Sequence, residues 1–292
     1  MKSVGLGTIF VTGATGNVGR EVIVALRNAG AQFRIGDRNP STVAAAPGQE
    51  VVVFDFLNAA TYRPAIADCN AIFLLRPPAI SNTRDTLNRF IDAVRDAGVY
   101  QIVFVSVAGA ESNPLVPHHA VERHLQDGPP GWTILRPGFF AQNLESAYRR
   151  DIRDDDRIYL PAGRGKVAFI DTRDLAEVAV RSLLDPRSHA GKAYTLTGPV
   201  AVSFAEVAKL LSAELGRTIS YRPASVVGYM RHLVEARMPV RQALVQTALH
   251  FGLRFGQADV VDSTLFCLLA RPPRTIGEYI HDRREMWLIQ QR

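Results

Sequence analysis

The chain of 292 residues has only two cysteines, Cys69 and Cys267, and no apolar run near the roughly 18 to 20 residues that span a bilayer. The cysteines lack C-x-x-C spacing, which excludes that kind of metal or redox motif and predicts buried free thiols. After Lys2, glycines 5 and 7 interrupt any continuous apolar segment of a signal peptide. We therefore expect a cytoplasmic protein without a membrane segment or a metal site.

Lysine is also scarce, at positions 2, 166, 192 and 209 among 34 basic residues. The net charge of +6 comes from arginines that are interleaved with acids, as in residues 149–157, and no long basic block is present. This pattern predicts a solvated surface and no nucleic-acid partner. With 47% hydrophobic residues, the chain is long enough for one large α/β domain and a smaller lobe.

What the chain does have is a glycine motif, GATGNVG at residues 13–19, between an apolar run and a helical pattern. Strand, glycine turn and helix follow one another as in dinucleotide-binding folds. Gly13 permits the tight turn, Gly16 lets backbone N–H groups approach phosphate oxygens, and Gly19 lets the helix lie close to the sheet. The predicted phosphate-binding residues are Gly13, Thr15, Gly16, Asn17, Val18 and Gly19.

Short apolar runs alternate with helical patterns through the first half of the chain, which predicts an α/β fold of the Rossmann type with a doubly wound parallel sheet. The expected strands are 8–12, 32–36, 51–54, 71–75, 102–106 and 133–135. We expect a dinucleotide-binding domain over 1–155. Residues 156–292 would add the last sheet strands and a smaller, helix-rich substrate-binding lobe, with the two lobes interleaved.

Two neighbouring charged residues give opposite indications about the cofactor. Asp37, at the end of the second expected strand, can accept hydrogen bonds from ribose hydroxyls and favours NAD(H). Arg38 can pair with a 2′-phosphate and favours NADP(H). Asp55, after the third expected strand, is placed to accept from the adenine amino group, although it suits an ordinary strand-end cap equally well.

Five stretches resemble the NmrA-like group of atypical short-chain dehydrogenases, which includes quinone reductase and triphenylmethane reductase types. They are VTGATGNVGR (11–20), DRNP (37–40), HHAVERHL (118–125), WTILRPGFFAQN (132–143) and FIDTRDLAEVA (169–179). The resemblance covers residues 8–287 and implies a Rossmann domain, a small C-terminal lobe and NAD(P)H-dependent reduction. It also implies that Arg76 and Pro137 border the ribose and nicotinamide. Family members commonly have an apolar or small residue where Asp37 stands, so NADP(H) is favoured and NAD(H) stays open.

None of the tyrosines is followed four residues later by a lysine, so the usual Tyr–Lys proton donor of short-chain dehydrogenases is missing. Hydride transfer without a strong acid suits quinones, iminium ions and extended enones, whose products are neutral or stabilised anions. His118 is a candidate proton donor because its ordinary pKa is about 6.5, and Ser106 is a candidate hydrogen-bond partner of the substrate. Each suits a structural role as well.

These observations predict an NAD(P)H-dependent oxidoreductase that acts on a small conjugated molecule. Phe139 and Phe140 are the expected apolar wall of the substrate site, or else core residues. The competing hypothesis is a noncatalytic NAD(P)-binding redox sensor of the NmrA type. A dehydratase or epimerase that uses NAD transiently is less compatible with the missing Tyr–Lys pair. A homodimer is compatible with the sequence.

Overall fold

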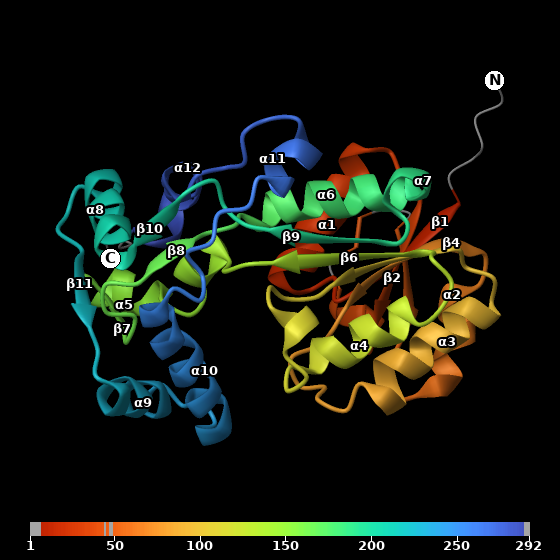
Figure 1. The fold of residues 1–292 in the computed structure, drawn as a ribbon, viewed down its shortest axis with the longest axis horizontal. Coiled ribbons are helices and arrows are strands. Elements are labelled where there is room, and N and C mark those ends of the chain that lie inside the picture. Colours follow the sequence, from red (N-terminus) through yellow and green to blue (C-terminus); the bar gives the residue numbers. More distant parts are fainter. Residues whose placement is uncertain (1–6, 44, 47–48, 289–292) are drawn as a thin grey trace. The chain divides into compact units, whose positions relative to one another are not determined.

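The computed structural model describes residues 7–43, 45–46 and 49–288, and the chain divides into two compact units (Figure 1). Unit 1 comprises Met1–Pro137 and Thr172–Leu196, and unit 2 comprises Gly138–Asp171 and Thr197–Arg292. The division expected at residue 155 falls within the first segment of unit 2. Residues 1–6, which begin the segment that lacks a signal-peptide pattern, lie outside the described residues.

Unit 1 is built on a seven-stranded parallel sheet in the order β3-β2-β1-β4-β5-β6-β9. The strands are β1 (Thr8–Thr12), β2 (Phe33–Asp37), β3 (Glu50–Val53), β4 (Cys69–Leu75), β5 (Gln101–Val105), β6 (Trp132–Pro137) and β9 (Lys192–Leu196). The order reverses at β1, as in a doubly wound fold, and confirms the predicted fold class. The six expected strands of the first half are confirmed with small shifts at their ends.

Helices cover both faces of this sheet. Figure 1 shows α1 and α6 on one face and α2, α3 and α4 on the other. Their bounds, with that of α7, are α1 (Asn17–Asn28), α2 (Tyr62–Ile66), α3 (Arg89–Asp96), α4 (Pro117–Gln126), α6 (Thr172–Leu184) and α7 (Pro186–His189). A π-helical turn, η3 (Arg84–Asn88), precedes α3, and 3-10 turns lie at η1 (Pro40–Thr42), η2 (Ala59–Thr61) and η4 (Ala110–Ser112).

Unit 2 joins two small sheets to several helices. Strand β7 (Arg157–Leu160) pairs in parallel with β11 (Ser220–Pro223), and β8 (Lys166–Ala168) pairs antiparallel with β10 (Ala201–Ser203). The helices are α5 (Arg149–Asp154), α8 (Phe204–Leu215), α9 (Val226–Glu235), α10 (Val240–Gly252), α11 (Thr264–Leu269) and α12 (Ile276–Arg283), with 3-10 turns η5 (Ala141–Leu144), η6 (Leu253–Phe255) and η7 (Arg284–Met286). The helix-rich composition expected for the C-terminal part is confirmed.

Each unit has its own apolar core. In unit 1, Phe10, Phe54 and Phe90 pack edge to face or tilted against one another under the helices on one face of the sheet. In unit 2, Trp287 is fully buried and donates from its indole N–H to the Leu144 carbonyl at 3.0 Å. Both cores hold large aromatic side chains, which contribute much of the apolar area that stabilises each unit.

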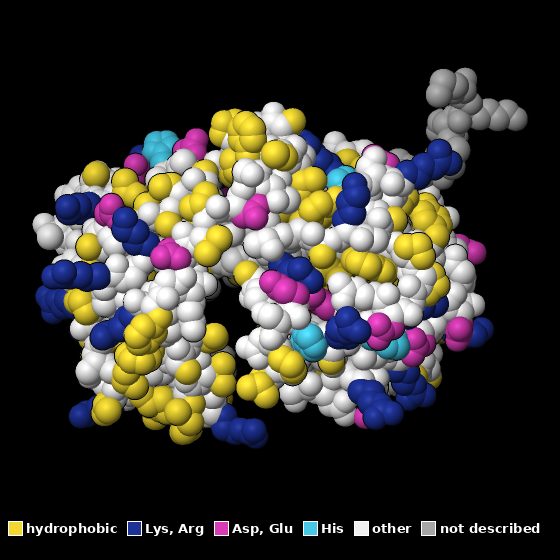
Figure 2. Space-filling view, in the orientation of Figure 1, with side chains coloured by type: hydrophobic (Ala, Val, Ile, Leu, Met, Phe, Trp, Pro, Cys, Tyr) yellow, Lys and Arg dark blue, Asp and Glu magenta, His cyan; other side chains and the backbone are white. Residues whose placement is uncertain are grey.

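Capping boxes fix the starts of two helices in unit 2. Ser203 and Glu206 form a capping box at the start of α8, and Thr275 and Glu278 form another at α12. Among the described residues, no helix combines the length and apolarity needed to traverse a bilayer. Figure 2 shows basic and acidic side chains interspersed over the visible face, without one large block of Lys and Arg.

Candidate functional site

The predicted cofactor residues of unit 1 follow the carboxyl ends of neighbouring strands. Across the sheet from β3 to β6, the edge carries Asp55, Asp37, the glycine loop, Arg76, Ser106 and Pro137 in that order. Strands in a sheet are spaced by about 4.8 Å, so the edge from Asp37 to Ser106 spans three intervals, or about 14 Å. This is the edge at which doubly wound folds bind dinucleotides.

The glycine loop presents unpaired backbone donors at the start of α1. Gly16 is the N-cap residue, no side chain caps the helix, and no acidic residue stands in its first turn. Thr15, Gly16 and Asn17 are exposed, whereas Val18 and Gly19 are buried. The first N–H groups of a helix have no partner within the helix and lie at its positive end. The loop is therefore a ready site for a phosphate group.

The three glycines of the motif meet different constraints. Gly13 has φ of +68°, and a Cβ there would lie 2.8 Å from Leu75 Cδ2. A Cβ on Gly19 would clash with the Gly13 carbonyl oxygen and lie 2.9 Å from Ala14 Cα. A Cβ on Gly16 would meet only the Gly13 oxygen at 3.5 Å. The protein itself thus requires glycine at 13 and 19, while the space beside Gly16 is open.

At the β2 end, Asp37 and Arg38 differ in what they already bind. Asp37 Oδ1 accepts a hydrogen bond from the Asn39 N–H at 2.8 Å, which ties one carboxylate oxygen to its own loop. Arg38 is exposed and makes no ion pair with any residue in the described part of the chain. Asp55 likewise accepts from the Leu57 N–H at 3.0 Å. Both acids therefore stabilise turns, and the guanidinium is free to bind an anion.

Arg76 binds its own loop and His118. Its Nη1 donates to the carbonyls of Pro77 at 3.1 Å and Ile80 at 2.5 Å, and its Nε donates to His118 Nε2 at 3.2 Å. Because Nε2 accepts, the proton of the neutral His118 ring lies on Nδ1. Nδ1 is buried and has no hydrogen-bond partner in the described structure. Burial, with a smaller contribution from the Arg76 charge, lowers the pKa of His118 to about 4.

His118 is thus a neutral imidazole at pH 7, not the readily protonated group that its ordinary pKa of about 6.5 predicts. The unfolded chain binds a proton there below pH 6.5 and the folded chain does not until about pH 4. Stability from this group is therefore present above pH 6.5 and is lost as the pH falls toward 4.

We expect the free energy of unfolding to fall by about 1 to 3 kcal/mol more between pH 6.5 and 4 in the wild type than in His118→Gln. The glutamine amide can still accept from Arg76 but does not titrate. Urea unfolding at several pH values measures this difference. Equal pH dependence of the two proteins would show that His118 is not held neutral.

A buried charged cluster beside this site was missed by the sequence reasoning. Ser106 donates to Glu122 Oε1, and Arg136 contacts the same carboxylate through Nε at 3.1 Å and Nη2 at 2.6 Å. The Glu122 side chain is 1% exposed, and Glu111 adds a contact to Arg136 at 3.4 Å. The hydroxyl proton of Ser106 is used in the hydrogen bond to Glu122. Ser106 could donate to a substrate only by giving up this bond, and that role stays a prediction.

Two signals in the sequence could have revealed this cluster. Glu122 stands at helical spacing between His118 and Leu125, on the side of α4 that also carries buried Val121. Arg136 interrupts the apolar strand β6. A charged residue within each buried pattern indicates a pair, because an isolated buried charge is strongly destabilising.

The predicted residues after β6 fall in both units. Pro137 ends unit 1, is buried, and its carbonyl accepts from the Ala108 N–H at 3.0 Å. Phe139 and Phe140 begin unit 2 and are partly buried. The Ile170 N–H donates to the Phe139 carbonyl at 2.9 Å, and the Ala141 N–H donates to the Ile170 carbonyl at 2.9 Å. These bonds fix the backbone that carries both rings.

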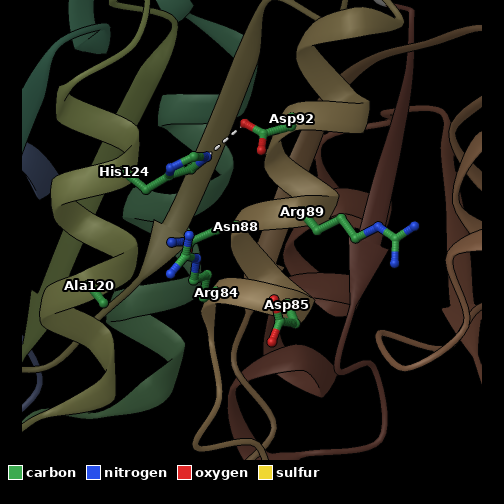
Figure 3. Close-up of a pocket in the computed structure, with 7 residues that line it drawn as sticks. All are labelled: Arg84, Asp85, Asn88, Arg89, Asp92, Ala120 and His124. Carbon is green, nitrogen blue, oxygen red and sulfur yellow. Dashed lines mark hydrogen bonds and ion pairs between the residues drawn. The ribbon is translucent and has the colours of Figure 1, made fainter.

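Unit 1 also has an open polar pocket of 540 Å³ in the helical layer (Figure 3). It lies between α4 and the η3–α3 segment, and Asp92 contacts His124 across it at 2.7 Å. The lining residues are Arg84, Asp85, Asn88, Arg89, Asp92, Ala120 and His124. None of the predicted cofactor or catalytic residues lines it. The described residues contain no cluster of His, Cys, Asp and Glu side chains suited to a metal ion.

Comparison with known proteins extends these observations. A family model described as NAD(P)H-binding matches residues 13–186. The chain is 31% identical to an NAD(P)H azoreductase of Xenophilus azovorans over 277 residues, which is 93% of this chain and 96% of the relative.

Solved structures agree with this match. A triphenylmethane reductase of Citrobacter sp. has a TM-score of 0.85 and 25% identity, with 95% of this chain and 99% of that chain covered. An NADPH-dependent quinone oxidoreductase of Escherichia coli, solved with NADPH, has a TM-score of 0.83 and 26% identity, with 94% and 99% covered.

Proposed function

We propose a substrate class from one premise: the chain belongs to the NAD(P)H-binding family and is an NAD(P)H-dependent oxidoreductase of the NmrA-like, atypical short-chain dehydrogenase type. The proposed reaction is transfer of hydride to a small conjugated electrophile such as a quinone, an iminium ion or an enone. The single observation that supports binding of the NAD(P)H diphosphate is the exposed start of α1, which no side chain caps and which has open space beside Gly16.

The choice of acceptor rests on the chemistry that unit 1 offers. When bound, a reduced nicotinamide supplies hydride. Besides Ser106, whose proton is used by Glu122, the candidate donor at this edge is the neutral His118 ring, whose Nδ1–H has no partner in the described structure. A neutral imidazole can donate a hydrogen bond to an oxygen that gains negative charge, but it is a weak acid. It therefore suits acceptors whose reduced form is a stabilised anion or needs no proton.

The named activities of the similar proteins support the same class. An azo compound, a triphenylmethane dye and a quinone are all conjugated electron acceptors, and those words describe the relatives rather than this chain. On this proposal Phe139 and Phe140 provide apolar surface for the acceptor. Pro137 and the Arg76 loop border the nicotinamide riboside, and Asp55 lies toward the adenine.

For the cofactor we propose NADP(H), with the Arg38 guanidinium bound to the 2′-phosphate. The support is that Arg38 is exposed, while one oxygen of Asp37 is already held by the Asn39 N–H. NAD(H) would instead require the Asp37 carboxylate to accept hydrogen bonds from both ribose hydroxyls. Because Oδ1 already accepts from the Asn39 N–H, Oδ2 is the Asp37 oxygen that is available for these hydroxyls.

Arg38→Ala is expected to weaken NADPH binding by about 10- to 100-fold, because a charge-assisted hydrogen bond to phosphate is lost. NADH binding should change little. Fluorescence titration of both nucleotides measures this, with the exposed Arg27→Ala as the control. An equal loss for both nucleotides would contradict the assignment of Arg38 to the 2′-phosphate.

The proposed activity is tested by mixing the purified protein and NADPH with duroquinone, an azo dye and a triphenylmethane dye. We expect oxidation of NADPH, followed at the absorbance band of the reduced nicotinamide, with at least one acceptor. Tight NADPH binding without turnover of any acceptor would overturn the proposal and favour a redox sensor.

A further inference from the structure

Phe139 packs in unit 2 against a buried histidine that the proposed reaction does not use. The rings of Phe139 and His250 meet edge to face at 5.9 Å and 89°. Phe169, at 5.6 Å, and Phe204, at 6.4 Å, complete the set of rings around Phe139. Phe139 is partly exposed, whereas His250 is 6% exposed. A molecule that touches the exposed part of Phe139 would therefore meet the Phe139 ring and not His250 behind it.

Hydrogen bonds fix the orientation of the His250 ring. Its Nδ1 lies 2.6 Å from the Gln246 carbonyl oxygen, which can only accept, so Nδ1 carries the proton. Burial lowers the pKa of His250, which favours the neutral ring. Nε2 is then an acceptor, and the hydroxyl of Tyr148 donates to it. Both ring nitrogens are thus bound, and the imidazole cannot rotate without losing a hydrogen bond.

The rest of this network is also buried. Tyr148 and Tyr229 are each 1% exposed, and the Tyr229 ring lies 5.5 Å from that of His250. Gln246 donates from Nε2 to the Tyr229 hydroxyl at 3.2 Å. The network joins α9, α10 and the segment before α5, and it ends on the ring of Phe139. A buried polar network whose members are satisfied holds its side chains in one arrangement.

We propose that Tyr148 and His250 are positioning residues that fix the ring plane of Phe139, and that Phe139 held in this way selects planar, fused-ring acceptors. The role of these residues in catalysis rests on the proposed function. The binding preference of unit 2 for planar, fused-ring molecules can be measured without any reaction. A fixed aromatic ring favours a flat conjugated partner because stacking needs parallel planes, and a ring that can tilt loses this preference.

The test is calorimetric titration of the full chain, without cofactor, with anthraquinone-2-sulfonate and with the single-ring duroquinone. Phe139→Leu should weaken anthraquinone-2-sulfonate binding by about tenfold, and Tyr148→Phe by about two- to tenfold. Duroquinone binding should change less. Tyr221→Phe is the matched control, since its hydroxyl donates to the Leu160 carbonyl at 3.4 Å in the same unit.

The double variant Phe139→Leu/Tyr148→Phe separates positioning from general destabilisation. If Tyr148 acts through Phe139, the double variant should bind no more weakly than Phe139→Leu alone. His250→Gln is a second variant that keeps an acceptor for the Tyr148 hydroxyl but removes the ring beside Phe139, and it should show the same loss. The inference would be overturned if the losses of anthraquinone-2-sulfonate affinity in Phe139→Leu and Tyr148→Phe multiplied in the double variant. It would also be overturned if both Tyr148→Phe and His250→Gln bound this ligand as tightly as the wild type.

This design distinguishes the inference from the proposed activity. Wild-type protein that prefers anthraquinone-2-sulfonate over duroquinone in a Phe139-dependent way, but oxidises no NADPH, would support the inference and overturn the activity. Wild-type protein that oxidises NADPH but does not bind anthraquinone-2-sulfonate would overturn the inference and leave the activity standing.

Discussion

Gly16→Val is expected to weaken NADPH binding by roughly 100-fold or more and to lower the melting temperature by only about a few degrees, since valine is a poorer N-cap than glycine. A Cβ at Gly16 meets no protein atom closer than 3.5 Å, and its φ of −82° and ψ of 169° suit any residue. The side chain would instead fill the space where a diphosphate approaches the first N–H groups of α1. Loss of two charge-assisted hydrogen bonds accounts for a change of this size.

The measurement is fluorescence titration with NADPH, together with a thermal melt. Gly277→Val in α12 of unit 2 is the matched control, because a Cβ there also has open space, with Thr275 Oγ1 at 3.8 Å. NADPH affinity that survives in a folded Gly16→Val protein would remove the basis for the cofactor site. A variant that loses affinity only as it unfolds would contradict the expectation that the folded protein has room for a side chain at Gly16.

The second large effect concerns stability. Arg136→Met should lower the free energy of unfolding by about 3 to 5 kcal/mol, because it leaves the buried Glu122 carboxylate without its cation. The remaining partner, the Ser106 hydroxyl, supplies one hydrogen bond where Arg136 supplied a bidentate contact. Removing one partner of a buried pair is far more costly than removing an exposed one.

Urea unfolding measures this loss. The control is Arg153→Met, since Arg153 pairs with Asp154 where both side chains are about two-fifths exposed (39% and 42%), and it should change stability by less than about 1 kcal/mol. Glu122→Leu/Arg136→Met should recover most of the loss, because an apolar pair of similar volume needs no charge compensation. A change below about 1 kcal/mol in Arg136→Met would mean that Glu122 is not held as a buried anion.

Local patterns were sufficient to predict the order of elements in unit 1. Apolar runs located six strands of the sheet within a few residues, and the glycine motif placed the turn between β1 and α1. The capping boxes at Ser203 and Thr275 are likewise local to the two helix starts of unit 2 that they stabilise. In each case the signal and the structure lie within a few residues of each other, so no long-range packing has to be known.

Properties that depend on distant residues could not be predicted in this way. The ordinary pKa of His118 gave no indication that Arg76, 42 residues away, donates to its Nε2. Tyr148 and His250 are separated by 102 positions, and nothing in either local pattern indicates that they share a hydrogen bond. Such pairs are set by how strands and helices pack, and the sequence patterns do not encode that packing directly.

The division of the chain into alternating segments has a practical consequence for anyone who wishes to exchange or express its parts. Unit 2 takes Gly138–Asp171 from the middle of the chain, and Thr172–Leu196 then returns to complete unit 1 with α6 and the edge strand β9. No single cut in the gene therefore separates the two units, because a cut that keeps both segments of one unit together divides the segments of the other. A chimaera that replaces unit 2 must be joined at three places, after Pro137, Asp171 and Leu196.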